Sequence, residues 1–417
     1  MTVDLKQFRS EGQAAFEQTG LPTRKLEQWK YTPLNKLEDL GFGGFAAADM
    51  PSLDALPASV PDIDAYRIVL VNGRYSDALS DMSGLDDRAT LIGLDAAVTD
   101  SLDVVHGILG HQVKTDMPMA ALNAARFEDG IVLHVPKSVA LEKPVHLVSL
   151  SVGSDNAVAA HPRLLISLGE NAEATLVESH LSIGDGVTLV NGVSEISVGP
   201  HARLGHYKLQ TEAANATHVW LNGVTLHDSA AYDSFVLQLG DGLVRNEVRA
   251  LLDGEHIDAR LNGAYFGTGS AHIDNTTFID HAKPNCQSRE VFKGVLDDQS
   301  RGVFQGKILV RPHAQKTDGH QLNRALLLSP KAEIDSKPEL EIYADDVKCS
   351  HGATTGDLDP DQLFYLKARG IDEAQARAML VQAFLMESID VIEKQAVRDV
   401  FADTLQARLT KMFGDMS

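Results

Sequence analysis

The sequence predicts a mainly β protein with a helical region at each end, and three observations support this. Between residues 130 and 345, short runs rich in β-branched residues alternate with Gly, Asn and Asp. The first 20 residues place apolar side chains at helical spacing, and so do about 60 residues at the other end. A chain of 417 residues is long enough to bury a large core.

The N-terminal region begins with an expected helix. Its apolar residues share one face: Leu5, Phe8, Ala15 and Phe16. Gly20 and Pro22 predict its end. The basic and aromatic stretch GLPTRKLEQWKYTPL follows, and such a stretch usually reflects packing together with solvated charge. The run RIVLVNGRYS then predicts a strand with a tight turn at Asn72 and Gly73.

The body consists of expected strands separated by turn residues. They are VHLVSLSV, RLLISLG, EATLVESHLSI, GVTLVNGVSEISVG, ATHVWLNGVTLHD, SFVLQLG, EVRALLDG and GVFQGKILV. A pattern sustained over roughly 200 residues predicts an all-β architecture, and a sandwich, a barrel or a β-solenoid would each fit. Because no strict hexapeptide or nonapeptide period is present, periodicity alone does not choose among them.

The C-terminal region is expected to be helical. Asp359 and Pro360 form a typical helix start, with Asp as the N-cap and Pro at the first helical position. Gly370 predicts the end of that short helix, and Asp372 the start of a longer helical region. An apolar stripe of period near 3.6 follows: Val397, Val400, Phe401, Leu405, Leu409, Met412 and Phe413. The stripe must pack on the chain's own body or on a partner protein.

Composition excludes several classes of function. Acidic residues outnumber basic ones 58 to 37, a net charge of -21 that argues against nucleic-acid binding. No apolar run reaches the roughly 18 residues that a membrane helix needs. The first residues, MTVDLKQFRSEGQ, lack the apolar core of a signal peptide. Two cysteines cannot form a disulfide framework, so we expect a cytoplasmic protein.

Familiar catalytic motifs are absent from the sequence. GVFQGKI contains Gly-Lys, but its spacing and its Ile do not fit a phosphate-binding loop. No GxSxG or HExxH motif occurs, and the acids around Asp359 fit helix capping better than a calcium loop. The stretch HIDNTTFIDHAKPNC holds His272, His281 and Cys286, but without standard zinc spacing, so we interpret these residues as structural.

The stretch DDVKCSHGAT holds the candidate site residues Cys349 and His351. On a strand, residues two apart face the same side, so the sulfur and the imidazole would lie close together. The pair is either a small buried Cys beside a capping His, a thiol whose pKa the imidazole lowers, or two metal ligands. Two ligands do not complete a zinc or iron–sulfur site, so a metal held here would be shared with another chain or held briefly.

Two longer stretches carry a family resemblance. RGVFQGKILVRPHAQKTDGHQLNRALLLSPKAEIDSKPELEIYADDVKCSHGATTGDLDPDQLFYLKARGI strongly resembles the SufB/SufD family of iron–sulfur cluster assembly proteins. GLPTRKLEQWKYTPL resembles the N-terminal signature of the SufD branch. SufB proteins typically carry His-Glu-Ala-Thr where this chain has Ser350-His351-Gly352-Ala353-Thr354, and the Lys348–Gly352 form looks like SufD.

The resemblance implies a right-handed parallel β-helix flanked by helical regions. We therefore expect an N-terminal helical or mixed region at 1–100, a β-helix core at 101–345 and a C-terminal helical region at 346–417. It also implies a scaffold subunit rather than an enzyme, acting in iron acquisition or cluster assembly. Its expected partners are a SufB-like paralogue, or a second copy of this chain, and the ABC-type ATPase SufC, which would supply ATP hydrolysis.

The same resemblance assigns roles to residues. SufB and SufD pair through β-helix edges, so Cys349 and His351 would lie near that junction and share iron or a transient iron–sulfur cluster with SufB. No cofactor is expected to bind tightly to the isolated chain. The ATPase would contact the C-terminal helices at or beside LFYLKARGI, through Leu363, Phe364, Tyr365, Leu366, Arg369, Gly370 and Ile371.

Two alternatives remain open. The chain could be a purely structural subunit that stabilises SufB without touching metal. A β-helix polysaccharide lyase or hydrolase would share the solenoid, but such enzymes are usually exported and need carboxylate clusters along a groove. Here the acids are dispersed.

Overall fold

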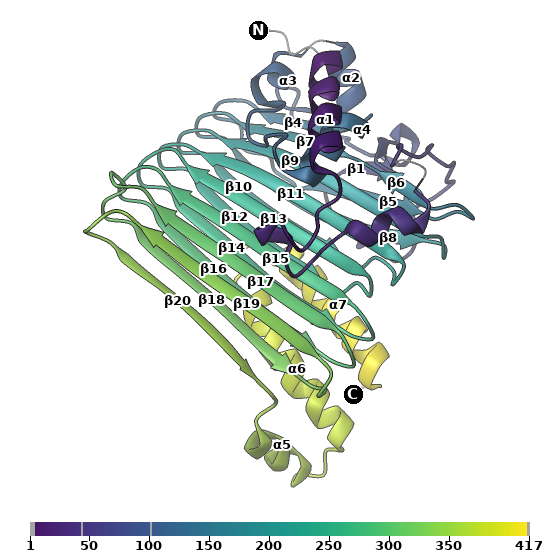
Figure 1. The fold of residues 1–417 in the computed structure, drawn as a ribbon, viewed down its shortest axis with the longest axis vertical. Coiled ribbons are helices and arrows are strands. Elements are labelled where there is room, and N and C mark those ends of the chain that lie inside the picture. The colour runs from purple at the N-terminus through teal and green to yellow at the C-terminus, as the bar shows by residue number, and fades with distance from the viewer. Residues whose placement is uncertain (1–4, 43–44, 101, 415–417) are drawn as a thin grey trace.

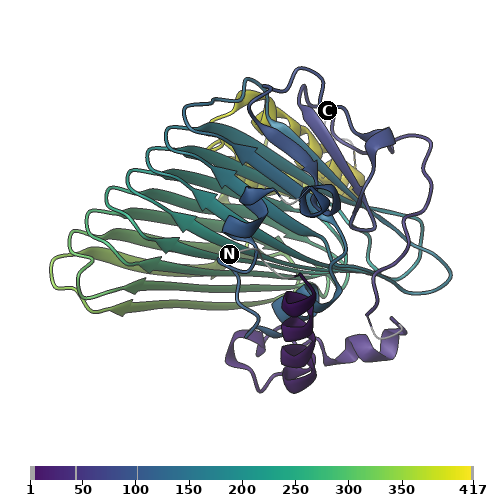
Figure 2. The ribbon, with the colours of Figure 1, turned by 90° about the horizontal axis from the view of Figure 1, so that it is seen from above.

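The computed structural model describes residues 5–42, 45–100 and 102–414. Its body is a parallel β-solenoid of about eight turns, with helices at both ends of the chain, so the mainly β prediction is confirmed (Figure 1). Each turn contributes one strand to each of two sheets, and the strands stack along the solenoid axis (Figure 2). Among the described residues, no helix is long and apolar enough to cross a lipid bilayer.

The two sheets share one connectivity, in which every second strand returns to the same sheet. Sheet A runs in the order β19 (Glu333–Ile342), β17 (Arg301–Val310), β15 (His272–His281), β13 (Leu243–Leu252), β11 (Ala216–Leu226), β9 (Thr188–Val198), β7 (Arg163–Leu168), β4 (Gly130–Val135) and β3 (Thr90–Gly93), with β6 (Val158–Ala160) beside β9. Sheet B runs in the order β2 (Arg74–Tyr75), β1 (Tyr66–Val71), β5 (Val145–Val152), β8 (Glu173–Ile183), β10 (Arg203–Gln210), β12 (Ala231–Gln238), β14 (Asp258–Gly267), β16 (Gln287–Leu296), β18 (Asp318–Leu327) and β20 (Lys348–Gly356).

The helices cover parts of this body. They are α1 (Leu5–Thr19), α2 (Leu94–Thr99), α3 (Asp103–Ile108), α4 (Pro118–Arg126), α5 (Pro360–Lys367), α6 (Glu373–Ile389) and α7 (Gln395–Phe413), with 3-10 turns η1 (Glu27–Trp29), η2 (Asn35–Leu40) and η3 (Asp77–Leu79). The expected first helix is confirmed as α1, and Gly20 follows it with φ 62°. Asn72 and Gly73, both at positive φ, form the expected turn from β1 into β2.

The expected domain borders do not coincide with element borders. β1 precedes residue 101 yet already pairs in parallel with β5 of the solenoid. β20 follows residue 345 and is the last strand of sheet B, so the helical part begins only at Pro360. The reason is that strand residues such as Thr354 and Thr355 continue the β-pattern up to the Asp359 cap.

One corner of each turn uses left-handed backbone, which explains why the turns stack. The residues at this corner have φ between 57° and 63°: Asn171, His201, Ser229, His256, Asn285 and Lys316. The Asn171 N–H donates to the carbonyl of Pro200 and the His201 N–H to that of Asp228, so these corners bond the next turn. A small residue often follows and fills the interior, as Ala172 and Ala202 do.

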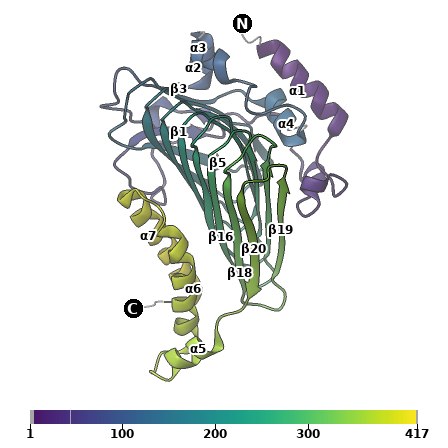
Figure 3. The ribbon, with the colours of Figure 1, turned by 90° about the vertical axis from the view of Figure 1, so that its left-hand side faces the viewer.

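The apolar stripe of the C-terminal region packs on the outer face of sheet B. Side chains of α6 and α7, among them Val381, Leu385, Phe401 and Leu405, form one buried cluster with outward-facing side chains of β8 to β16. Figure 3 shows α6 and α7 lying along this face, with α5 extending beyond the strands. Packing on the chain's own body, one of the two expectations, is therefore what the structure shows for this stripe.

The two ends of the solenoid differ. At the N-terminal end, β2 and β3 pair antiparallel to β1 and β4 and so terminate both sheets. At the C-terminal end, β19 and β20 each pair with a single strand among the described residues (Figure 1). Ile342 and Tyr343 lie exposed beside this edge. The solenoid therefore ends in short antiparallel strands at one end and in long parallel edge strands at the other, which we call the open end.

Candidate functional site

Cys349 and His351 lie on β20, the edge strand at the open end. Cys349 is in register with Gly319 of β18, and His351 with Gln321. Gln321 is buried inside the solenoid, so its neighbour His351 faces the interior side of the last turn. Cys349 packs partly buried against the main core, whereas His351 is exposed. The expected same-sided arrangement of the two residues is what the strand provides.

The environment of Cys349 does not activate its thiol. Burial raises the pKa of Cys349, and the nearby Asp318 carboxylate raises it further, while a backbone hydrogen bond from Gly319 acts the other way. Of the three alternatives for the pair, a thiol pKa lowered by the imidazole finds no support in the isolated chain, where the net effect is a raised pKa. His351 is exposed at the rim, and burial rather than an imidazolium charge dominates at the sulfur.

Neither this pair nor any other set of described residues forms a complete metal site. No group of three or more His, Cys, Asp or Glu side chains comes together in the described ranges in a way that would hold a metal ion. The arrangement at the open end offers two ligand types, a thiol and an imidazole, on a surface that a second chain can reach.

The other cysteine and its neighbouring histidines are packed as structural residues. Cys286 occupies the corner position that Ala172 and Ala202 occupy in earlier turns, and its thiol lies 3.1 Å from the carbonyl oxygen of Gly254. Burial raises its pKa. His281 is buried with its Nε2 2.9 Å from Ser288 Oγ. His272 contacts Thr32 at 2.9 Å.

A buried ion network inside the solenoid was not apparent from the sequence. Glu178 is fully buried, and its carboxylate lies 2.7 Å from His180 Nε2, 2.5 Å from His206 Nε2 and 3.4 Å from Lys208 Nζ. Burial by itself raises the pKa of Glu178, but Lys208 and the imidazoles outweigh it and hold the pKa well below its usual range. Its members lie on adjacent strands β8 and β10, about 30 residues apart, so only the solenoid register brings them together.

The basic and aromatic N-terminal stretch acts as an anchor on sheet A. The Trp29 ring lies 4.1 Å from the guanidinium of Arg245, which is fully buried and paired with Glu247 and Asp274. Thr32 donates a hydrogen bond to the same Asp274 carboxylate. The stretch therefore covers a buried charge cluster, in agreement with the packing interpretation.

The residues expected to bind an ATPase lie on or just after α5. None of the residues of α5 is buried. Phe364 is 74% exposed and Tyr365 56% exposed, values large enough to mark an apolar contact surface. The Arg369 guanidinium lies 4.0 Å from the centre of the Tyr365 ring. A hollow of about 400 Å³ beside them is lined by Asp361, Gln362, Tyr365, Leu366 and Leu380.

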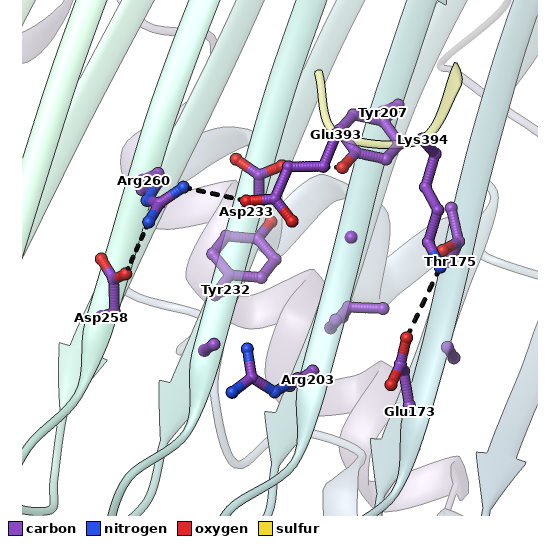
Figure 4. Close-up of a pocket in the computed structure, with 14 residues that line it drawn as sticks. Glu173, Thr175, Arg203, Tyr207, Tyr232, Asp233, Asp258, Arg260, Glu393 and Lys394 are labelled. Carbon is purple, nitrogen blue, oxygen red and sulfur yellow. Dashed lines mark hydrogen bonds and ion pairs between the residues drawn. The ribbon is translucent and has the colours of Figure 1, made fainter. Parts of the chain in front are cut away.

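Another hollow, of about 320 Å³, lies between sheet B and the loop that joins α6 to α7 (Figure 4). The Tyr207 ring lies over Gly205, where an added Cβ would be 3.0 Å from the ring. The loop is held at both sides of the hollow, by Lys394 Nζ 3.5 Å from Glu173 and by Glu393 3.2 Å from Arg260. Since the acidic and basic side chains here largely pair with each other, we interpret them as ion pairs that hold the α6–α7 loop on sheet B.

Comparisons with known proteins agree with this architecture. The family model described as "SUF system FeS cluster assembly, SufBD core domain" matches residues 151–384, and "SufBD protein N-terminal region" matches residues 2–147. The chain is 34% identical to the iron–sulfur cluster assembly protein SufD of Escherichia coli K12, over 94% of this chain and 90% of the relative. It is 31% identical to an iron–sulfur cluster assembly SufBD family protein of Synechocystis, over 89% and 84%. It is 26% identical to SufD of Bacillus subtilis, over 97% and 94%.

Proposed function

Because this chain belongs to the SufB/SufD family of iron–sulfur cluster assembly proteins, in its SufD branch, we propose that it is a non-catalytic scaffold subunit that works in the cytoplasm. In this proposal it pairs with a SufB-like chain through the open end of the solenoid and with a SufC-like ATPase through α5. Cys349 and His351 contribute ligands to iron or to a nascent cluster at the junction. Both cysteines are free thiols, which fits a reducing compartment.

The observation that carries the proposal is the difference between the two ends of the solenoid. Edge strands with unpaired N–H and C=O groups invite another strand, and proteins usually cover them. Here the two-residue β2 and the four-residue β3, both antiparallel, form the edges at one end, whereas the ten-residue β19 and the nine-residue β20 present long parallel edges at the other. A second solenoid added at this edge would continue both sheets, and a second copy of this chain is the alternative occupant.

The placement of Cys349 and His351 supports a shared site. Both side chains belong to the last strand, on the interior side of the final turn. A partner strand would therefore face them directly and could add the ligands that this chain lacks. Iron or the cluster is the cargo of the complex in this proposal, and this chain supplies two of its contacts.

The first experiment measures iron and acid-labile sulfide in the complex co-purified with the SufB-like and SufC-like chains of the same genome. We expect His351→Asn to lower both contents several-fold and Cys349→Ser to lower them less, with the complex still assembled. His320→Asn is the control, because His320 is a partly exposed histidine on the neighbouring strand whose ladder partner, Ser350, points to the opposite face. A normal iron and sulfide content in the His351→Asn complex would refute the ligand role and support a purely structural subunit. Loss of the complex itself would mean that the variant disrupts the contact at the open end.

The second experiment separates the two partner surfaces. Replacing Phe364 and Tyr365 together by Ala should abolish capture of the ATPase while the SufB-like partner still binds. Replacing Tyr343 by Ser at the open edge should weaken the solenoid contact and leave the ATPase bound. All three are exposed, so their replacement removes little packing within the chain. The assignment fails if both variants lose the same partner.

The alternative of a polysaccharide-active enzyme has no support in the molecule. The family match extends over both the N-terminal region and the core. The acidic residues of the hollow above sheet B mainly serve to hold the α6–α7 loop.

A further inference from the structure

A column of three polar side chains runs through the interior of the last turns to the open end. Glu290 of β16 is in register with Gln321 of β18, and Gln321 is in register with His351 of β20. Glu290 and Gln321 are 1% and 2% exposed, which places them inside the solenoid rather than on its rim. Adjacent strands are about 4.8 Å apart, so in-register side chains on one face of a parallel sheet stack on each other.

The amide of Gln321 is held in one orientation. Its Nε2 donates a hydrogen bond of 2.8 Å to Glu290 Oε2. Above the raised pKa of Glu290, about 7, the carboxylate is ionised and only accepts, so at that pH the nitrogen must point toward β16. The opposite sheet provides the space for this amide. A Cβ added to Gly306 would lie 2.3 Å from Gln321 Nε2, so a side chain there would displace the amide from this position.

This orientation leaves the amide oxygen directed elsewhere. Gln321 Oε1 is buried and has no hydrogen-bond partner among the described side chains. A buried polar atom without a partner usually costs about 1–3 kcal/mol and calls for an explanation. The side chain next in the column is the imidazole of His351, which can donate a ring N–H.

We propose that Glu290 and Gln321 are positioning residues for His351: Glu290 orients the Gln321 amide, and the amide oxygen, which has no partner in this structure, accepts one ring N–H of His351 when the imidazole turns toward it. This leaves the other ring nitrogen as a free acceptor for the cargo at the junction. Histidines that bind metal commonly donate their second ring N–H to a carboxylate, a backbone carbonyl or a water, and a Gln amide oxygen is a carbonyl acceptor of the same kind. The inference rests on the proposed role of His351, but it concerns the isolated chain and is tested there.

The test is the tautomer of His351 in the full-length chain labelled with ¹⁵N-histidine. Two-bond ¹⁵N–¹H correlation spectra distinguish the Nδ1–H and Nε2–H forms, and the spectrum of His351→Asn identifies the signals. The measurement is made about two pH units above the ordinary histidine pKa of about 6.5, where a typical imidazole is neutral and its tautomer visible.

We expect one dominant tautomer in the unaltered protein. Gln321→Leu should shift the tautomer ratio roughly fivefold, the factor that corresponds to one net hydrogen bond. Glu290→Leu should do the same by releasing the amide, whereas Glu290→Gln keeps an acceptor for Gln321 Nε2 and should preserve the ratio. Gly306→Ala, which displaces the amide without replacing any residue of the column, should also shift the ratio.

Asn323→Leu is the matched control. Asn323 is as buried as Gln321 and lies on the same strand, but it is in register with Ala353. The inference is overturned if Gln321→Leu and Asn323→Leu change the His351 tautomer ratio equally. It is also overturned if neither variant changes the ratio. The proposed function is judged separately by the cargo content of the His351→Asn complex. A normal cargo content there would refute the ligand role and leave the tautomer result standing.

Discussion

Replacing Glu290 by Gln should stabilise the protein at high pH and change little at low pH. Glu290 is fully enclosed by the solenoid, and its burial raises the pKa of the carboxyl group from about 4.5 to about 7, although hydrogen bonds from Thr277 and Gln321 act in the other direction. The folded chain therefore keeps a proton on Glu290 at a pH where the unfolded chain has released it.

The sign and size of the expected change in unfolding free energy follow from this difference in pKa between the folded and unfolded chain. A pKa that is higher in the folded state contributes stability that is fully present below about pH 4.5 and is lost as the pH rises through 7. A gap of about 2.5 pKa units, at about 1.4 kcal/mol each, amounts to about 3 kcal/mol of unfolding free energy. Gln carries no proton to lose. The variant should therefore exceed the parent by up to about 3 kcal/mol at pH 8 and by little at pH 4.5.

The assay is urea-induced unfolding of both proteins at several pH values, followed by circular dichroism. Other groups that titrate, such as the buried histidines, are common to both proteins and cancel in the difference. Gln321→Met is the companion variant, because it removes a donor to the ionised carboxylate and should make the loss of stability with pH steeper. If the stabilities of the Glu290→Gln variant and the parent run parallel from pH 4.5 to 8, the buried carboxyl does not retain its proton and the reasoning is wrong.

Three further predictions concern packing. Phe401→Ala should lower the unfolding free energy by about 3–5 kcal/mol in urea titrations, because the ring is fully buried between α7 and sheet B; a cost below about 1 kcal/mol would contradict the docking of α7. Ending the chain after residue 358 should give aggregated protein in size-exclusion chromatography, since the apolar outer face of sheet B would lose its cover; a monodisperse, folded truncation would contradict this. Cys286→Ala should cost no more than about 1 kcal/mol by thermal melting, because other corners already hold Ala, and native Cys286 should resist alkylation far longer than Cys349.

The sequence predicted the elements whose signals are local. Asp359 caps α5 by accepting hydrogen bonds from the N–H groups of Asp361 and Gln362, and Asp372 caps α6 through Gln375. These structures depend on residues only a few positions apart. A helix cap can be predicted from the sequence because its donor and acceptor are only a few residues apart.

The periodicity of the sequence did not identify a solenoid, because the repeat of this solenoid is not strict. Successive turns differ in length, since Arg203 pairs with Ala231 but Gln287 pairs with Asp318. The repeated feature is a left-handed corner residue followed by a small buried one, as in Asn171-Ala172. Different residue types fill the corner, so the signal emerges only when the turns are aligned by their hydrogen bonds.

The candidate site was predicted in part. Cys349 and His351 were found because they lie two positions apart on one strand, and the strand exists as β20. Glu290 and Gln321 were missed, since each is separated from the next member of the column by about 30 residues. Nothing in the local sequence around Glu290 distinguishes it from a surface acid, and only the register reveals its burial.

In the C-terminal region, the sequence pattern predicted that an apolar helix face is buried but not which surface it packs against. The stripe on α7 correctly indicated burial, but a stripe does not tell which surface it covers, and here it covers the chain's own sheet. What remains for a partner is α5, where Phe364 and Tyr365 are exposed without a helical apolar stripe. The proposed partner surface is thus the part of the C-terminal region that the fold leaves uncovered.

The connection between β20 and α5 joins the two proposed partner surfaces. β20 ends at Gly356 and α5 begins at Pro360, and between them Leu358 is buried in the cluster formed by sheet B, α6 and α7. A buried side chain in so short a connection leaves little freedom for α5 to turn independently of the edge strand. A movement of α5 caused by a partner would therefore be transmitted within a few residues to β20, the strand that carries Cys349 and His351. The same segment that presents the two candidate ligands is, for this reason, the segment through which binding at one surface can influence the other.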